Sequence, residues 1–354
     1  MLSLVVQTLL SAVDLREHAR SGQALSPAKV PEHAADAHAN ISVAELAETF
    51  LWQNDEANWE QFADVLRKDS TLRPRVLVSK GCSGSTPAIT YLRMLIEAHG
   101  VKPAENKFEL FRCDEGTANC ATDVGSLRAA VARFAAKGQA LVFKASRREE
   151  GFGTTPDVWQ ALRDMDARVA VAWRSNSLAQ AACAVRDCFG EMKGKAKLVG
   201  NNTDSCFARR ELEAEQQPRV WFYTSSLMQT LSSYQQDPEE RAHPLLTAGW
   251  KRKEFSTQTT EDLLAFEDLS ESGLAKSTKA WSDLLRSLGI EPRLEILTPI
   301  LKTNTDATDP HEEKLEDVIA NKDEVAALLN EAGAPFNDML DASTGRFERR
   351  GDVV

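Results

Sequence analysis

Short apolar runs alternate with longer segments of helical periodicity through most of the chain. Apolar runs bounded by turn residues are typical of buried strands, whereas apolar positions that recur every three or four residues are typical of amphipathic helices. The pattern predicts strands at 75–79, near 106–112, near 139–144, at 167–173 and near 262–267. It predicts helices near 42–54, 56–68, 87–99, 123–137, 177–190, 275–288 and 312–332, one more helix between the strands at 139–144 and 167–173, and mostly helical sequence up to 237.

This alternation of strands and helices predicts an α/β fold, because parallel strands joined by helices form a sheet that is covered on both faces. We expect one such domain over residues 71–340. Residues 1–70 are expected to form a helical extension and linker, and residues 341–354 a polar tail. The apolar stretch at 2–13 lacks a positively charged flank and is too short to span a bilayer, so we interpret it as a docking helix, with a cleaved targeting peptide as the alternative.

The segment from 75 to 100 joins an apolar strand to an amphipathic helix through a turn rich in Gly, Ser and Thr. Backbone N–H groups of such a turn converge on an oxyanion, and the helix that follows directs its unpaired N–H groups and positive dipole end to the same place. Thr86 is a good N-cap and Pro87 is favoured at the first helical position, so the helix is predicted to begin at Pro87. The segment therefore predicts an anion-binding turn.

Two familiar classes do not fit this turn. An ATP-type P-loop needs a lysine after its last glycine, whereas Lys80 precedes both glycines. A hydrolase nucleophile elbow needs glycine at the position of Ser85. A nucleoside triphosphatase and an elbow-type hydrolase are therefore disfavoured.

A second segment, from 167 to 189, repeats the order of strand, turn and helix, and Arg174 stands at the end of its strand. Ligands of open α/β sheets bind at the carboxyl ends of the strands. A guanidinium stays charged and offers a planar fork that matches phosphate oxygens. The alternative is an arginine that pairs with a neighbouring carboxylate.

Together the two segments resemble the sulfotransferases that use PAPS. In that family a basic residue and a run such as S-G-[ST]-T hold the 5′-phosphosulfate, and an arginine followed by a helical serine holds the 3′-phosphate. The bacterial trehalose-sulfotransferase branch is closest in pattern, through Arg174, Asn176, Ala179, Gln180 and Ala181. This chain departs from the family in having Cys82 before the run and Cys183 at the serine position. The resemblance covers about residues 74–335 and implies contacts to the cofactor from Lys80, Gly81, Cys82, Ser83, Gly84, Ser85, Thr86, Arg174, Asn176, Cys183 and, by position in a late polar loop, Lys302.

The activity that the resemblance implies is transfer of a sulfuryl group from PAPS to a hydroxyl or amine of a small-molecule or carbohydrate acceptor, with PAP as product and no metal. Lys80 is the candidate for stabilising the transferred group, and Glu109 is the candidate base, with Glu105 and His311 as alternatives. The competing class is a nucleotide-binding or interaction protein that keeps the fold without transferase activity, and Cys82 and Cys183 favour it.

Composition restricts the partners. The 354 residues are 42% hydrophobic and 27% charged, as in a soluble globular protein, and the net charge of −11 argues against nucleic acid and anionic membranes. An anionic cofactor must therefore be met by local positive charge. The six cysteines form no C-x-x-C pair and no zinc-type spacing, so we expect no structural metal. We interpret them as reduced thiols, with a disulfide between Cys113 and Cys120 as the alternative for a secreted chain. A cytoplasmic location is favoured, with the lumen of the secretory pathway as the alternative if residues 1–13 are a targeting segment.

Overall fold

The computed structural model describes residues 41–79, 85–104, 110–111, 121–146, 155–192, 208–211, 219–256, 264–270, 274–307 and 315–340. All but the first two of these residues belong to one compact unit, Val43–Val354. The apolar stretch at 2–13 and the tail at 341–354 lie outside the described residues. No helix in the described part of the chain is long and apolar enough to cross a membrane.

The centre of the unit is a parallel four-stranded sheet in the order β2-β1-β3-β6. Its strands are β1 (Arg75–Ser79), β2 (Val142–Ser146), β3 (Arg168–Trp173) and the two-residue β6 (Leu264–Ala265). Val76 of β1 lies opposite Phe143 of β2 and Val169 of β3, so the apolar runs pair with one another. Every residue of β1 is buried, as expected for the inner strand of a sheet covered on both faces. The predicted α/β class and parallel sheet are confirmed.

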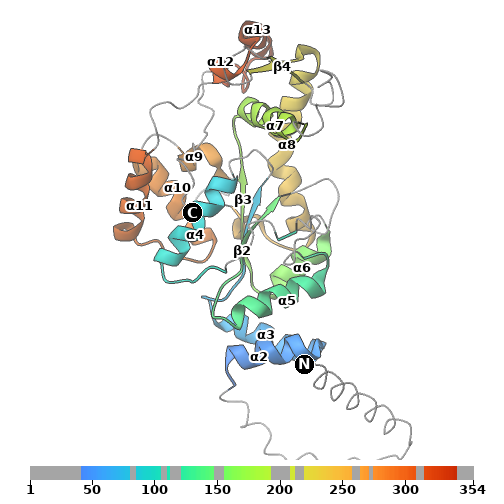
Figure 1. Cartoon of the computed structure of the whole chain (residues 1–354), viewed down its shortest axis with the longest axis vertical. Coiled ribbons are helices and arrows are strands. Elements are labelled where there is room, and N and C mark those ends of the chain that lie inside the picture. The colour runs from blue at the N-terminus through green and yellow to red at the C-terminus, as the bar shows by residue number, and fades with distance from the viewer. Residues whose placement is uncertain are drawn as a thin grey trace, which may run out of the picture. The chain divides into compact units, whose positions relative to one another are not determined.

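Alternate side chains of the strands enter two separate hydrophobic clusters, as the pleat of a strand requires. Val76 and Val78 belong to the first cluster and Leu77 to the second. The first is completed by α2 (Val43–Gln53), α3 (Glu56–Lys68), α5 (Val124–Ala135), α6 (Pro156–Asp164) and α8 (Thr224–Thr247). The second is completed by α4 (Ser85–Ala98), α9 (Phe266–Ser270), α10 (Leu274–Ser287) and α11 (Leu294–Ala307). Helices α5, α6 and α8 therefore lie on one side of the strands, and α4, α10 and α11 on the other (Figure 1).

A third, smaller cluster joins α7 (Ser177–Met192) to β5 (Arg219–Phe222), α12 (Leu315–Val318) and α13 (Lys322–Ala332). Strand β5 pairs antiparallel with β4 (Ala208–Glu211). On its other side, buried Asn321 accepts a hydrogen bond from the N–H of Phe222 (3.0 Å) and donates one to its carbonyl (2.9 Å). The asparagine amide thus gives Phe222 the two bonds that another strand would supply.

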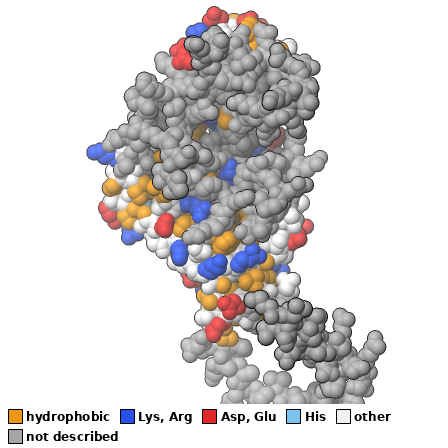
Figure 2. Space-filling view, viewed as in Figure 1, with side chains coloured by type: hydrophobic (Ala, Val, Ile, Leu, Met, Phe, Trp, Pro, Cys, Tyr) orange, Lys and Arg blue, Asp and Glu red, His pale blue; other side chains and the backbone are white. Residues whose placement is uncertain are grey.

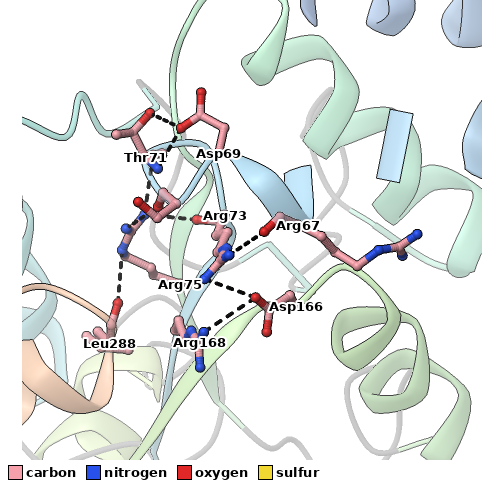
Figure 3. Close-up of polar contacts among 9 residues, drawn as sticks. Arg67, Asp69, Thr71, Arg73, Arg75, Asp166, Arg168 and Leu288 are labelled. Atoms are coloured by element: carbon pink, nitrogen blue, oxygen red, sulfur yellow. Dashed lines mark hydrogen bonds and ion pairs between the residues drawn. The ribbon is translucent and has the colours of Figure 1, made fainter. Parts of the chain in front are cut away.

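The amino end of the sheet holds a cluster of arginines (Figure 3). Arg75 is 2% exposed and donates to four backbone carbonyls, those of Leu288 (3.2 Å), Thr71 (3.4 Å), Arg73 (2.9 Å) and Ser70 (2.8 Å). Burial, reinforced by repulsion from Arg73 and Arg168, lowers the pKa of Arg75 to about 10. Arg73 and Arg168 pair with Asp166 at 3.0 and 3.4 Å. In the space-filling view, Lys and Arg side chains gather just above α2 and α3, the end at which the chain enters β1 (Figure 2).

Several predicted elements differ from those observed. Helix α4 begins at Ser85, two residues before Pro87, which the first helical turn tolerates because its N–H groups have no helical partner. The strand expected near 106–112 is wrong at Leu110 and Phe111, which lie in a turn, while the rest of it is outside the described residues. The strand expected to 267 stops at Ala265, and α9 follows directly. The helix expected at 312–332 is broken between α12 and α13.

Candidate anion-binding site

The two segments singled out in the sequence end side by side at the carboxyl edge of the sheet. Val78 of β1 pairs with Val171 of β3, so the turn after Ser79 and the residue after Trp173 leave neighbouring strands. Arg174 is that residue after Trp173. Of the turn, only the start of α4 is described, and the side chains of Ser85 and Thr86 are outside the description. The candidates that lie outside the described residues altogether are Lys80, Gly81, Cys82, Ser83, Gly84, Glu105, Glu109 and His311.

Arg174 is 5% exposed and forms an ion pair with Glu267, the second residue of α9, with 3.5 Å between Nε and Oε1. Its guanidinium also lies 5.8 Å from the centre of the Phe266 ring. Burial lowers the pKa of Arg174, and the carboxylate of Glu267 opposes that shift. The carboxylate pairing that the sequence left as an alternative for Arg174 is therefore observed.

The carboxylate of Glu267 also caps the amino end of α7. Oε2 accepts from the N–H of Ser175 (2.9 Å) and Oε1 from the N–H of Asn176 (3.2 Å). These N–H groups belong to the positive end of the helix dipole, where an anion is most stable. A carboxylate thus occupies the head of α7 and pairs with Arg174, the residue that the resemblance to sulfotransferases implies as a ligand of the 3′-phosphate.

Asn176 is the N-cap residue of α7. Its Oδ1 accepts from the N–H of Ala179 (3.0 Å), and its Nδ2 donates to the carbonyl of Met339 (2.9 Å). The neighbouring hydroxyl of Ser177 contacts the sulfur of Met339 (3.4 Å). Asn176 therefore fixes the head of α7 and ties it to the far end of the chain.

Cys183, in the second turn of α7, is disulfide-bonded. The interpretation of the cysteines as reduced thiols is therefore wrong for this residue, which has neither a hydroxyl nor a thiol proton to donate to a phosphate.

The end of β1 shows a feature that the sequence analysis missed. Arg241, from the middle of α8, is 4% exposed, and its Nη1 donates to the carbonyl of Ser79, the last residue before the turn (3.4 Å). The hydroxyl of Ser79 is fully buried and has no hydrogen-bond partner within the described residues. On the neighbouring strand, Lys144 is 7% exposed and lies level with Leu77. Three buried basic side chains, Lys144, Arg174 and Arg241, thus come from strands and a helix that meet at or near this edge.

Lys302 does not lie in a loop, as the sequence predicted, but in α11, where it is exposed. Helix α11 packs against α10 and α4. The structure therefore gives Lys302 a helical surface position rather than one on a late loop.

In chemical terms, this edge can attract an anionic ligand, because Lys144, Arg174 and Arg241 place three buried basic side chains at or near it. Among the described residues, no group of three or more His, Cys, Asp or Glu side chains is placed to hold a metal ion. Comparison with protein-family models, with curated proteins and with solved structures found no significant match.

Proposed function

We propose that the carboxyl edge of the sheet binds an anionic nucleotide and that the protein is a PAPS-dependent sulfotransferase acting on a small-molecule or carbohydrate acceptor. The observation that carries the proposal is the pairing of Arg241 with Ser79. A buried guanidinium and a buried hydroxyl lie where β1 ends and the turn that resembles the family's phosphosulfate loop begins. Arg241 supplies from α8 the cation that the family usually carries at the position of Cys82.

Sulfuryl transfer spreads negative charge over the oxygens of the migrating group, so catalysis depends on alignment and on fixed positive groups. The burial of Arg241 and its bond to the backbone fix its guanidinium before a ligand arrives. Lys80 and the N–H groups of the turn would stabilise the bridging oxygen, and Glu109 would take the acceptor's proton. The resemblance to sulfotransferases implies these roles for Lys80, the turn and Glu109.

The test is calorimetric titration with PAP, followed by incubation with radiolabelled PAPS and a mixture of sugar, phenol and amine acceptors. Arg241→Met should weaken PAP binding at least tenfold, since it removes a fixed charge from the phosphosulfate position. Arg252→Met is the matched control, because Arg252 forms a surface pair with Glu239 at 2.7 Å. Equal affinity in the wild type and Arg241→Met would remove the assignment of the site.

A second candidate is a nucleotide-binding protein without transferase activity. The capping of α7 by Glu267 and the disulfide at Cys183 favour it, because both occupy groups that the family uses for the cofactor. PAP binding without transfer to any acceptor class would support this candidate over the enzyme.

A further inference from the structure

The carboxylate of Glu267 fills the second anion position of the site from within the chain. We propose that Glu267 takes the place of a nucleotide 3′-phosphate at the head of α7, so that the protein recognises its donor through the 5′ end alone. The inference rests on the proposed function and names the ligand class: 5′-phosphosulfate nucleotides, bound equally well with or without a 3′-phosphate.

The contacts that Glu267 already makes leave few hydrogen-bond donors for a phosphate at the head of α7. Both oxygens of Glu267 accept hydrogen bonds, from the N–H groups of Ser175 and Asn176, and Oε1 also lies 3.5 Å from Nε of Arg174. A phosphate bound by these same groups would have to displace the carboxylate. A phosphate placed beside it would meet a like charge at short range in a partly buried setting, where such repulsion is strong.

The backbone around Glu267 holds the carboxylate in place. Phe266 and Leu269, on either side of it in α9, are 2% and 3% exposed and belong to the second hydrophobic cluster. Strand β6, which leads into α9, pairs with β3 through Ala172 and Trp173, directly before Arg174. The two partners of the ion pair therefore directly follow adjacent strands of one sheet, and the buried neighbours of Glu267 fix the backbone from which its carboxylate reaches Arg174.

Arg174 is accordingly a positioning residue for Glu267 and not a ligand of the nucleotide. If no 3′-phosphate binds here, the chain does not need the hydroxyl with which the family's serine holds that phosphate. The disulfide-bonded Cys183 at the serine position is consistent with this.

The experiment compares adenosine 3′,5′-bisphosphate (PAP) with 5′-AMP by calorimetry on the full chain. The wild type should bind the two within threefold of each other. Glu267→Gln keeps the size and the amide can still cap α7, but it removes the charge, so PAP affinity should rise at least tenfold relative to 5′-AMP. Glu56→Gln is the matched control, because Glu56 pairs with Arg128 at 2.7 Å on the surface of α3 and should leave both affinities unchanged.

The outcomes separate this inference from the proposed function. Wild-type protein that binds PAP more than tenfold tighter than 5′-AMP overturns the inference while supporting the nucleotide site, and this measurement needs no variant to fold. Tighter PAP binding in Glu267→Gln alone supports the inference. Binding of neither nucleotide by either protein overturns both.

Discussion

Replacing Arg75 by methionine removes a guanidinium that donates to four backbone carbonyls, three in the 70–73 turn and one at Leu288. A hydrogen bond contributes about 1 kcal/mol net, and a buried acceptor left without a donor costs about as much again. Water can reach part of the 70–73 turn, whereas the Leu288 bond is buried. Methionine keeps the apolar contacts of the arginine stem, so we expect a loss of about 3–4 kcal/mol in the free energy of unfolding.

Arg75→Lys distinguishes the hydrogen bonds of the guanidinium from the effect of its positive charge. Lysine keeps the cation, which burial and two neighbouring arginines disfavour, but it cannot reach four carbonyls in different directions. We therefore expect Arg75→Lys to be at least as destabilising as Arg75→Met. Urea unfolding followed by tryptophan fluorescence measures both, with Arg168→Met as a milder control, since Arg168 makes a 3.4 Å pair and is 38% exposed. A loss below about 1 kcal/mol in Arg75→Met, or a clearly milder Arg75→Lys, would refute the reasoning.

Two further predictions concern stability. Gly249 has φ +83° and an added Cβ would clash with Nη1 of Arg163, so Gly249→Ala should lower the free energy of unfolding by about 1–2 kcal/mol. An unchanged midpoint of thermal unfolding would contradict this. Asp123 caps α5 and accepts a hydrogen bond from the N–H of Ser126, which lowers the pKa of Asp123 from its ordinary value. The charged carboxylate therefore stabilises the fold at neutral pH, and this stabilisation is lost as the pH falls through the lowered pKa of the folded state. Asp123→Ala should therefore cost about 1 kcal/mol near pH 7 and less near pH 3, and a cost that grows on acidification would speak against the cap.

The strongly apolar segments of the fold were predictable. Strand β1 was predicted at its observed bounds, and β3 and α3 within a residue, because each carries a clear buried pattern. Strands β4 and β5 were missed because each is only four residues long, and β4 (Ala-Arg-Arg-Glu) carries no residue that favours a strand. Strand β6 has only two residues, so it forms because it pairs with β3, and its own sequence is too short to predict its bounds.

The candidate site was predictable only in part. The position of Arg174 at the end of a strand follows from the local pattern, but its partner Glu267 lies more than ninety residues later. A usable signal was present: the strand expected near 262–267 ends in an acidic residue, which is expected beside Arg174 if the two strands are neighbours. Arg241 carried no such signal, because an arginine after two glutamates looks like an exposed helix position and only the packing of α8 buries it.

The hydrogen bond between Asn176 and Met339 bears on how the protein folds during its synthesis. The amide that orders the first turn of α7 finds its acceptor 163 positions further along the chain. During synthesis the head of this helix therefore reaches its final form only after residue 339 has been translated, and contacts of such long range slow folding. A nascent chain halted earlier could carry the four-stranded sheet with the first turn of α7 not yet anchored.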